Sequence, residues 1–174
     1  MKTLVIGGAR SGKSTHATQL ARERASDVCA IVTATASDPE MAARIAAHRA
    51  ARPAHWHVRE EPVRLGAALR EEGERHALLL IDCLTLWTAN CLWAEATPDP
   101  DTYRWQRELQ DFLEALQASS RELIIVTNEV GTGIVPENAA ARLFRDEHGW
   151  LNQKVAALCE QVVLVVAGIA TRIK

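Results

Sequence analysis

A glycine-rich loop near the N-terminus, Gly7–Ser14, carries the residues best suited to chemistry. Its sequence GGARSGKS fits the pattern GxxxxGK(S/T), with a short apolar run before it and a helical pattern after it. In such loops backbone N–H groups converge on phosphate oxygens, helped by the N-terminus of the following helix. We predict that Lys13 reaches the phosphates of a nucleoside triphosphate and that the Ser14 hydroxyl binds Mg²⁺. The predicted phosphate-binding residues are Gly7, Gly8, Ala9, Arg10, Ser11, Gly12, Lys13 and Ser14.

An acidic residue that could serve the same metal ion follows a buried-strand pattern further along the chain. The run Leu78–Ile81 is entirely apolar and ends in Asp82. The carboxyl end of a strand is where α/β sheets bind ligands, so we predict Asp82 beside Mg²⁺. The alternative is that Asp82 caps the helix predicted to start at Leu84. One carboxylate could do both.

A histidine on an arginine-rich helical segment is the third candidate for chemistry. On a helix, Arg44 lies one turn before His48 and Arg52 one turn after it, while Arg49 is the next residue. Guanidinium groups repel a metal ion but neutralise a polyphosphate. A neutral imidazole beside a polyphosphate can attack phosphorus. From the residues alone, an exposed histidine on a charged surface helix remains the alternative.

Composition and charge exclude several classes of protein. The chain has 174 residues, 48% of them hydrophobic, with 20 basic and 22 acidic side chains. A net charge of −2 gives no electrostatic reason to expect nucleic-acid or anionic-membrane binding. The longest apolar run falls far short of the ~20 residues of a membrane span, and we expect no signal peptide. The four cysteines, none with CxxC spacing, predict reduced, mostly buried thiols in a cytoplasmic protein rather than a zinc site or disulfides.

The order of the predicted elements indicates one α/β domain over residues 1–174. Short apolar runs without alternation are typical of parallel strands covered on both faces, and they alternate with helical patterns as in a three-layer sandwich. The last two runs are separated by Ala167-Gly168, which predicts an antiparallel C-terminal hairpin strand. The predicted strands are Thr3–Ile6, Val28–Ala34, Ala77–Asp82, Glu122–Thr127, Val162–Ala167 and Ile169–Ile173. The predicted helices are Lys13–Ala25, Pro39–Arg52, Val63–Glu72, Leu84–Glu95, Thr102–Ser119 and Glu137–Cys159, with a loop over Ala96–Asp101 and an interruption of the last helix near Gly149.

Two further motifs decide between classes of P-loop protein. A GTP-dependent switch needs DxxG after the acidic strand and NKxD after a late strand. Here Asp82 is followed by Cys-Leu-Thr, and the late strand ends in Thr127-Asn128-Glu129-Val130. We therefore favour a small-molecule kinase or nucleotidyltransferase, with an ATPase module of a larger assembly as an open alternative.

Three segments resemble one enzyme family along essentially the whole chain: Gly7–Ser14, Glu40–Trp56 and Val126–Asn138. They resemble the bifunctional adenosylcobinamide kinase / adenosylcobinamide-phosphate guanylyltransferases of cobalamin biosynthesis. The resemblance implies a RecA-like P-loop NTPase fold and a homotrimer. It also implies phosphorylation of adenosylcobinamide by ATP or GTP, then transfer of GMP from GTP through a histidine to give adenosylcobinamide-GDP and pyrophosphate. The histidine of the family pattern RIxxHRxxRP is His48 here.

The resemblance also implies nucleotide contacts outside the loop. For Thr33 and Thr35 a strand-end turn is an equal alternative, for Glu60 a solvated acidic pair with Glu61, and for Arg10 a solvated position at the loop tip. The family often has glutamate where this chain has Asp82, which keeps the charge but shortens the reach. The implied contacts are Thr33, Ala34, Thr35, Arg49, Ala50, Ala51, Arg52, Glu60 and Asp82.

The remaining histidines and aromatic residues fit structural roles better than chemical ones. We expect His55 and His57 to be surface or packing residues and His16 to be packed rather than catalytic. For Trp87, Cys91 and Trp93, core packing is favoured over contact with a corrin ring or a subunit interface. The Gly131-Thr132-Gly133 segment should lie at the same sheet edge as the P-loop, where it could form a lid or a corrinoid wall.

Overall fold

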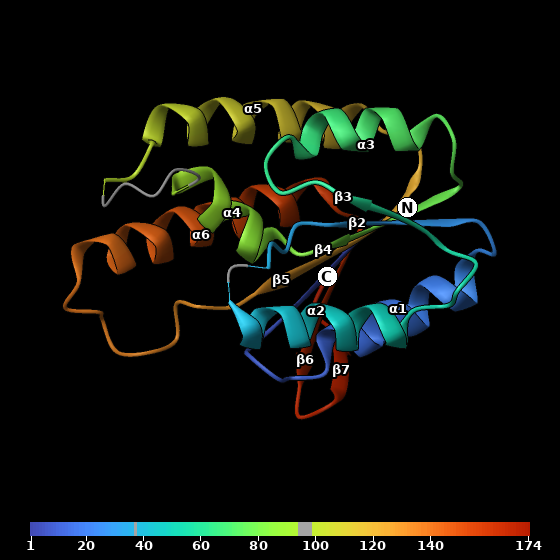
Figure 1. The fold of residues 1–174 in the computed structure, drawn as a ribbon, viewed down its shortest axis with the longest axis horizontal. Coiled ribbons are helices and arrows are strands. Elements are labelled where there is room, and N and C mark those ends of the chain that lie inside the picture. Colours follow the sequence, from blue (N-terminus) through green and yellow to red (C-terminus); the bar gives the residue numbers. More distant parts are fainter. Residues whose placement is uncertain (37, 94–98) are drawn as a thin grey trace.

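A computed structural model describes residues 1–36, 38–93 and 99–174, with Arg44 described by its backbone. Its centre is a seven-stranded sheet in the order β3-β2-β4-β5-β1-β6-β7 (Figure 1). The strand pairings are parallel except for β6 with β7, which confirms the predicted C-terminal hairpin. The strands are β1 (Lys2–Gly7), β2 (Val28–Val32), β3 (His57–Glu60), β4 (Leu78–Asp82), β5 (Glu122–Asn128), β6 (Gln161–Val166) and β7 (Ile169–Arg172).

Helices cover the sheet on both faces, as the unbroken apolar strands predict. Figure 1 shows α1 and α2 on one face and α3 to α6 on the other. Alternate strand residues supply two cores: Leu79 and Ile81 pack toward the larger helical layer, while Leu78 and Leu80 pack toward α1. The helices are α1 (Lys13–Arg24), α2 (Pro39–Ala51), α3 (Leu65–Gly73), α4 (Leu84–Leu92), α5 (Thr102–Ala118) and α6 (Ala139–Leu158). The three-layer prediction is confirmed.

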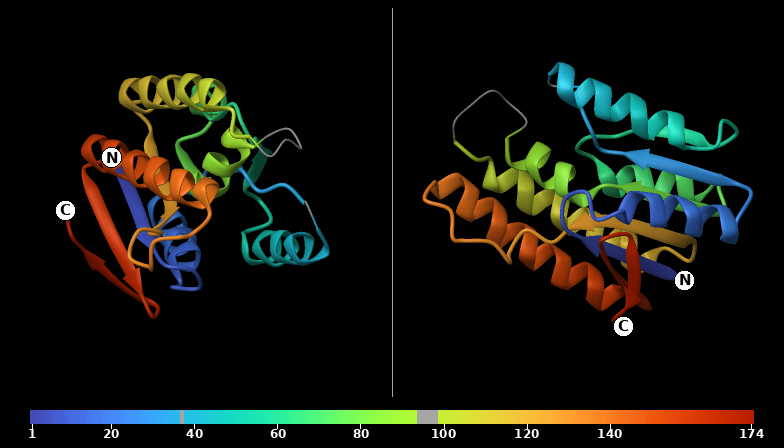
Figure 2. Two further views of the ribbon diagram at one scale, coloured as in Figure 1. Left: turned by 90° about the vertical axis from the view of Figure 1, so that its left-hand side faces the viewer. Right: turned by 90° about the horizontal axis from the view of Figure 1, so that it is seen from below.

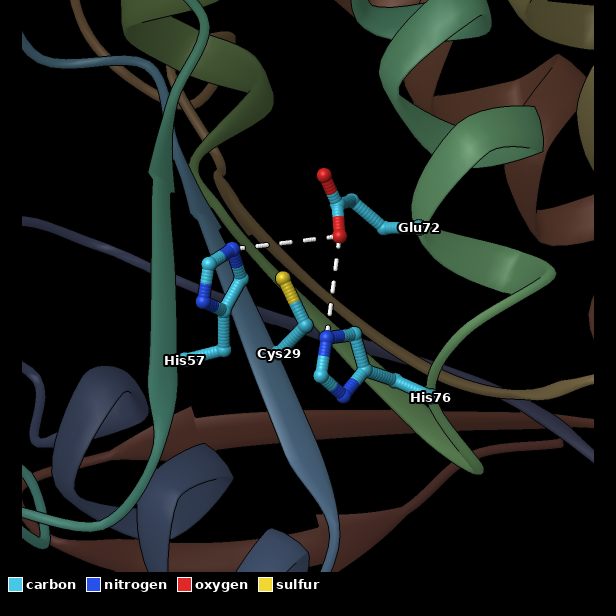
Figure 3. Close-up of side chains that lie close together, drawn as sticks. All are labelled: Cys29, His57, Glu72 and His76. Carbon is cyan, nitrogen blue, oxygen red and sulfur yellow. Dashed lines mark ion pairs between the residues drawn. The ribbon is translucent and has the colours of Figure 1, made fainter.

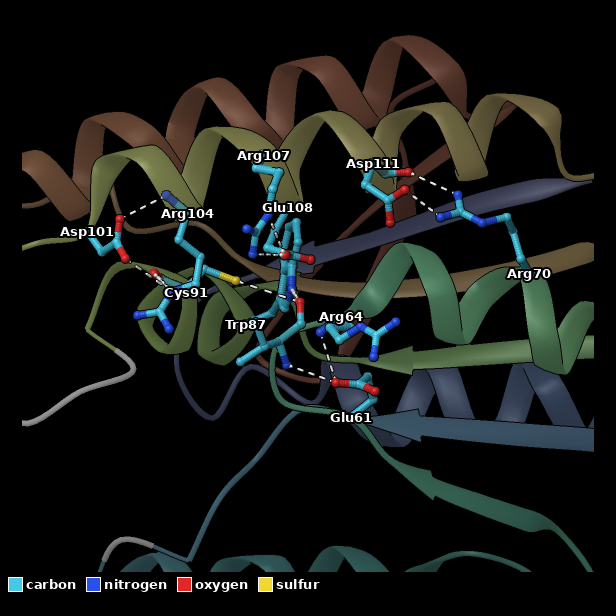
Figure 4. Close-up of polar contacts among 11 residues, drawn as sticks. Glu61, Arg64, Arg70, Trp87, Cys91, Asp101, Arg104, Arg107, Glu108 and Asp111 are labelled. Carbon is cyan, nitrogen blue, oxygen red and sulfur yellow. Dashed lines mark hydrogen bonds and ion pairs between the residues drawn. The ribbon is translucent and has the colours of Figure 1, made fainter.

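The larger helical layer is tightly fixed, as the polar contacts in Figure 4 show. A side chain at Gly66 of α3 would lie 2.8 Å from the backbone carbonyl of Asp111, so glycine lets α3 and α5 approach closely. Arg70 of α3 adds an ion pair with the Asp111 carboxylate. The buried Trp87 of α4 donates from Nε1 to the carbonyl of Val63 at 2.7 Å. This wall holds α4, and with it the end of β4, in place.

Helix α2 differs from the other helices because none of its described residues is buried. Its start follows local rules: Asp38 caps the helix by accepting from the backbone N–H of Met41 at 2.8 Å, and Pro39 occupies the first turn. At its end, Arg22 of α1 donates to the carbonyl of Ala51 at 2.9 Å. Figure 2 shows α2 alongside α1 at the margin of the molecule. Helix α2 therefore presents its side chains to solvent and to the cleft beside α1.

Two predictions of secondary structure are wrong. Strand β3 (His57–Glu60) was not predicted because its sequence HVRE has no apolar run; it forms through parallel pairing with β2 at the sheet edge. Helix α6 runs through Gly149 without interruption. Buried contacts of His148 and Leu151 on either side hold the helix, and these outweigh the cost of about 1 kcal/mol for a helical glycine.

The remaining boundaries agree with the sequence to within a few residues. The predicted loop over 96–101 and the end of the predicted helix over 84–95 lie partly outside the described residues, at 94–98. Asp101 caps α5 by accepting from the backbone N–H of Arg104. Among the described helices, none combines the length and the apolar character that crossing a bilayer requires.

Candidate active site

The glycine-rich loop joins β1 to α1 at the carboxyl edge of the sheet. Gly12 has a φ of +95°, a left-handed conformation that favours glycine, and Arg10 at the tip also has a positive φ of 55°. The Lys13 ammonium group donates to the carbonyl of Gly8 at 3.0 Å. From behind, Gly168 in the β6–β7 turn donates its N–H to the carbonyl of Ser11 at 2.8 Å. The C-terminal hairpin thus supports the loop directly.

The second predicted site residue, Asp82, makes an ion pair with helix α2. Its Oδ2 accepts from Arg52 Nη2 at 2.8 Å and lies 3.6 Å from Nδ1 of His48. Burial raises the pKa of Asp82, but His48 and Arg52 outweigh it and hold the pKa below the usual value. Asp82 does not cap α4, because Cys83 occupies the N-cap without a side-chain bond. The carboxylate is therefore ionised and turned toward α2.

A cleft of about 300 Å³ between α1 and α2 brings the histidine and the phosphate loop together. His48 has a side chain 47% exposed, so the imidazole is accessible while its Nδ1 faces Asp82. Ser14 stands on the α1 side of the same cleft. The lining residues are Ser14, Thr15, Thr18, Gln19, Arg22, Ala47, His48, Ala51 and Arg52.

The residues that directly follow β2 support the site in different ways. Thr33 is fully buried, and its hydroxyl donates to the carbonyl of Cys83 at 2.7 Å and accepts from the N–H of Cys83 at 3.0 Å. Its side chain thus fixes the chain just after Asp82. Ala34 and Thr35 lie beyond the end of β2, with Thr35 exposed.

The other predicted contacts are more scattered. Arg49 and Ala50 are exposed on α2, and Glu60 is exposed at the end of the edge strand β3. Two arginines, Arg44 and Arg52, were predicted to flank His48. The side chain of Arg44 lies outside the described part of the structure, and Arg52 lies one turn after His48 as predicted. The structure brings together the loop, His48, Arg52 and Asp82.

The segment after β5 lies at the same edge, as predicted. The N–H of Glu129 donates to the carbonyl of Gly7 at 3.1 Å, which joins this segment to the start of the phosphate loop. Gly131 and Gly133 follow it in an exposed turn.

A second, apolar cleft of about 470 Å³ opens between α4, α6 and the segment after β5. Trp93 lines it, whereas Trp87 and Cys91 are fully buried, so core packing is confirmed for these two. The lining residues are Ala89, Trp93, Val130, Pro136, Ala140, Ala141, Phe144 and Arg145.

A buried histidine that sequence reasoning missed holds this edge together. His148 of α6 has no exposed surface, and its ring nitrogens lie 3.1 Å from the hydroxyls of Thr88 and Thr127. Nε2 also lies 3.2 Å from the carbonyl of Asn128. Burial lowers the pKa of His148 to about 4, so the ring is neutral at physiological pH. The sequence held one signal for the burial of His148: it lies on the same helical face as the apolar residues Leu151 and Val155.

The sequence model described as cobinamide kinase / cobinamide phosphate guanyltransferase matches residues 3–173. The chain belongs to this family. It is 47% identical over 174 residues to the bifunctional adenosylcobalamin biosynthesis protein CobP of Pseudomonas aeruginosa, covering 100% of this chain and 98% of that protein. It is 41% identical over 182 residues to the bifunctional adenosylcobalamin biosynthesis proteins CobU of Escherichia coli and Salmonella typhimurium, covering each chain completely.

A solved structure supports the fold of this cobinamide kinase / cobinamide phosphate guanyltransferase family member. The chain is similar to an ATPase from the type III secretion system of pathogenic bacteria, with a TM-score of 0.55 at 12% identity. The likeness covers 98% of this chain and 56% of that one, and it concerns the fold alone. The predicted P-loop fold is confirmed. The prediction of a bifunctional kinase and nucleotidyltransferase, rather than a GTP-dependent switch, is confirmed as well.

Proposed function

We propose that the enzyme carries out its second reaction through a covalent GMP–histidine intermediate on His48. It first phosphorylates the hydroxyl of adenosylcobinamide with ATP or GTP, then passes GMP from GTP to adenosylcobinamide phosphate to give adenosylcobinamide-GDP. The observation that carries this proposal is the position of His48, in one cleft with Ser14 and with Nδ1 toward Asp82.

The pairing of His48 with Asp82 suits nucleophilic attack by the histidine. The Asp82 carboxylate favours the imidazole tautomer with its proton on Nδ1, which leaves the Nε2 lone pair for attack on phosphorus. Nε2 forms a bond to the α-phosphorus of GTP, the bond to the β-phosphate bridging oxygen breaks, and pyrophosphate leaves. The corrinoid phosphate oxygen then attacks the same phosphorus and releases the histidine. Arg52 adds positive charge beside the reacting phosphates.

The loop supplies the phosphate site for both reactions. Ser11 Oγ is buried without a hydrogen-bond partner in the described part of the chain, which supports a ligand oxygen nearby. Lys13 would contact the phosphates, and Ser14 and Asp82 offer the hard oxygen ligands that Mg²⁺ prefers. When bound, Mg²⁺ would neutralise phosphate charge during transfer. We also propose nucleotide contacts from Ala34, Thr35, 49–51 and Glu60, with the fully buried Thr33 supporting them from behind through its bonds to Cys83.

The remaining surfaces suggest where larger partners bind. The apolar cleft beside Trp93 suits one edge of the corrinoid, and the exposed Ile134 and Val135 directly precede its lining residue Pro136 in the sequence. Helix α2 exposes an alanine-rich surface that a second subunit could cover, in keeping with a homotrimer. Use of ATP and GTP is in keeping with a cytoplasmic enzyme.

Labelled GTP tests the covalent step. The enzyme is incubated with Mg²⁺ and GTP labelled at the α-phosphate, then denatured, and retained label is mapped by peptide mass spectrometry. We expect label on the peptide containing His48 and none retained from GTP labelled at the γ-phosphate. Complete guanylyl transfer without any retained label, under rapid quenching, would exclude the intermediate.

A further inference from the structure

Four side chains with metal-binding atoms gather at the end of the sheet opposite the phosphate loop (Figure 3). Cys29 and His57 are paired positions near the starts of β2 and β3, Glu72 lies in the last turn of α3, and His76 follows that helix. One sulfur, nitrogen or oxygen atom from each lies within 4.8 Å of the others. The strands run in parallel, so this cluster lies at their amino ends and the active site at their carboxyl ends.

The buried carboxylate of Glu72 points into the cluster (Figure 3), and one of its oxygens makes no hydrogen bond within the described residues. The residue is 2% exposed, and its Oε1 accepts from Arg59 Nη1 at 3.0 Å. Its Oε2 is buried and has no hydrogen-bond partner among the described residues. Oε2 lies 3.6 Å from His76 Nε2 and 3.9 Å from His57 Nε2. Leaving such an oxygen unsatisfied is costly, and a cation between these atoms would satisfy it.

The orientation of His76 is the one found for metal-bound histidines. Its Nδ1 lies 2.7 Å from the Asp27 carboxylate, which favours a proton on Nδ1 and leaves the Nε2 lone pair facing the cluster. The rings of His57 and His76 stack with their centroids 5.2 Å apart, and both Nε2 atoms lie toward Glu72 (Figure 3). Asp27 thus has the place of an outer-shell carboxylate.

We propose that Cys29, His57, Glu72 and His76 form a structural Zn²⁺ site. Zinc bonds of about 2.0–2.3 Å in a tetrahedron put ligand atoms about 3.3–3.8 Å apart, close to the Oε2–Nε2 separations found here. One thiolate and one carboxylate balance the charge of Zn²⁺. Four protein ligands fill the coordination shell, so the ion would tie together β2, β3 and the end of α3 rather than perform catalysis.

The neighbouring charges are compatible with a cation. Arg59 contacts Glu72 through Oε1, and Arg75 lies 3.8 Å from the same oxygen, so both guanidinium groups meet Glu72 away from the oxygen that faces the histidines. Burial raises the pKa of the Cys29 thiol to about 12, so Zn²⁺ must displace a proton on binding. The His57 side chain is 51% exposed and leaves a path for the ion. The metal-free alternative is an ion cluster in which His57 and His76 contact Glu72 directly.

This site has no local sequence signature. Its members stand 28, 15 and 4 positions apart, and Cys29 belongs to no CxxC pair. The expectation that the cysteines bind no zinc was based on that spacing. The fold brings the four residues together through the β2–β3 pairing and the return of the chain from α3.

Cobalt substitution tests the proposal on the full-length protein. The protein is stripped with a chelator, returned to Mg²⁺-containing buffer to fill hard-oxygen sites, and titrated with Co²⁺ and then Zn²⁺. We expect one Co²⁺ per chain, with the absorption of tetrahedral cobalt and a thiolate-to-cobalt charge-transfer band. Zn²⁺ should displace Co²⁺ and raise the unfolding temperature.

Variants separate the metal site from the ion cluster. His57→Gln, at an exposed position, should weaken Zn²⁺ binding more than the ~10–100-fold expected for Asp27→Asn. Cys29→Ala should remove the charge-transfer band, and the exposed His55→Gln is the matched control with unchanged binding. A folded wild-type protein without that band, or equal zinc affinity in His57→Gln and wild type, would overturn the proposal in favour of the ion cluster.

Discussion

His48 Nδ1 lies 3.6 Å from Asp82 Oδ2, and this pair joins the exposed helix α2 to the end of the interior strand β4. The two residues are 34 positions apart in the sequence. Arg52, one turn after His48, contacts the same oxygen at 2.8 Å. Asp82, predicted to bind the metal, and His48, predicted to attack phosphorus, are therefore direct neighbours in the site.

Replacing His48 should separate the two reactions. In His48→Ala the retained GMP adduct and all formation of adenosylcobinamide-GDP should be lost, while phosphorylation of adenosylcobinamide persists because direct transfer to a hydroxyl needs no enzyme nucleophile. The amounts of adenosylcobinamide phosphate and adenosylcobinamide-GDP formed by the variant measure the two reactions separately. The wild-type adduct should be acid-labile and alkali-stable, as a phosphoramidate is. His55→Ala and His57→Ala are controls that should still label; label lost in His55→Ala and retained in His48→Ala would transfer the role to His55.

Asp82→Asn tests the carboxylate without changing its shape. Loss of the charge should slow guanylylation and phosphorylation by about 100-fold, because the metal ligand and the partner of His48 are both weakened. Turnover is measured against Mg²⁺ concentration, and thermal unfolding is measured in parallel. A variant with lowered stability and unchanged turnover would assign Asp82 a structural role.

Lys13→Ala should impair both half-reactions, since each needs the triphosphate seated on the loop. We expect a loss of about 100- to 1,000-fold in turnover, as for removal of a donor to developing charge. Circular dichroism should show an intact fold. Near-normal kinase turnover in the folded variant would remove the loop lysine from the mechanism.

His148 should make stability dependent on pH. Its pKa is about 4 in the folded protein against 6.5 for the free side chain, so the unfolded chain binds more protons between these values. The stabilisation is complete above pH 6.5 and is lost as pH falls toward 4, by up to about 3 kcal/mol. Denaturant unfolding at pH 7 and pH 5 measures this.

His148→Gln removes the titrating group and should flatten that pH dependence while lowering stability at pH 7, where the buried hydrogen bonds are lost. The exposed His55→Gln should leave the pH dependence unchanged. Equal slopes in His148→Gln and wild type would show that another group causes the effect.

The phosphate loop, the acidic end of β4 and the start of α2 could each be predicted from a short stretch of sequence. Each is a contiguous pattern: Gly7–Ser14 between a strand and a helix, an apolar run ending in Asp82, and Asp38 before Pro39. Their conformations depend on near neighbours along the chain, such as a capping side chain or a glycine that can adopt a positive φ. The unbroken apolar strands likewise required burial on both faces.

Tertiary structure decided which of these residues meet. Strand β3 exists because β2 offers an edge to pair with, and His148 is neutral because α4 and β5 enclose its ring. The His48–Asp82 pair and the Cys29–Glu72 cluster join residues far apart in the sequence. Such contacts depend on strand order and on how helices lie against the sheet, and these are set by the burial of the whole core rather than by any short stretch of sequence.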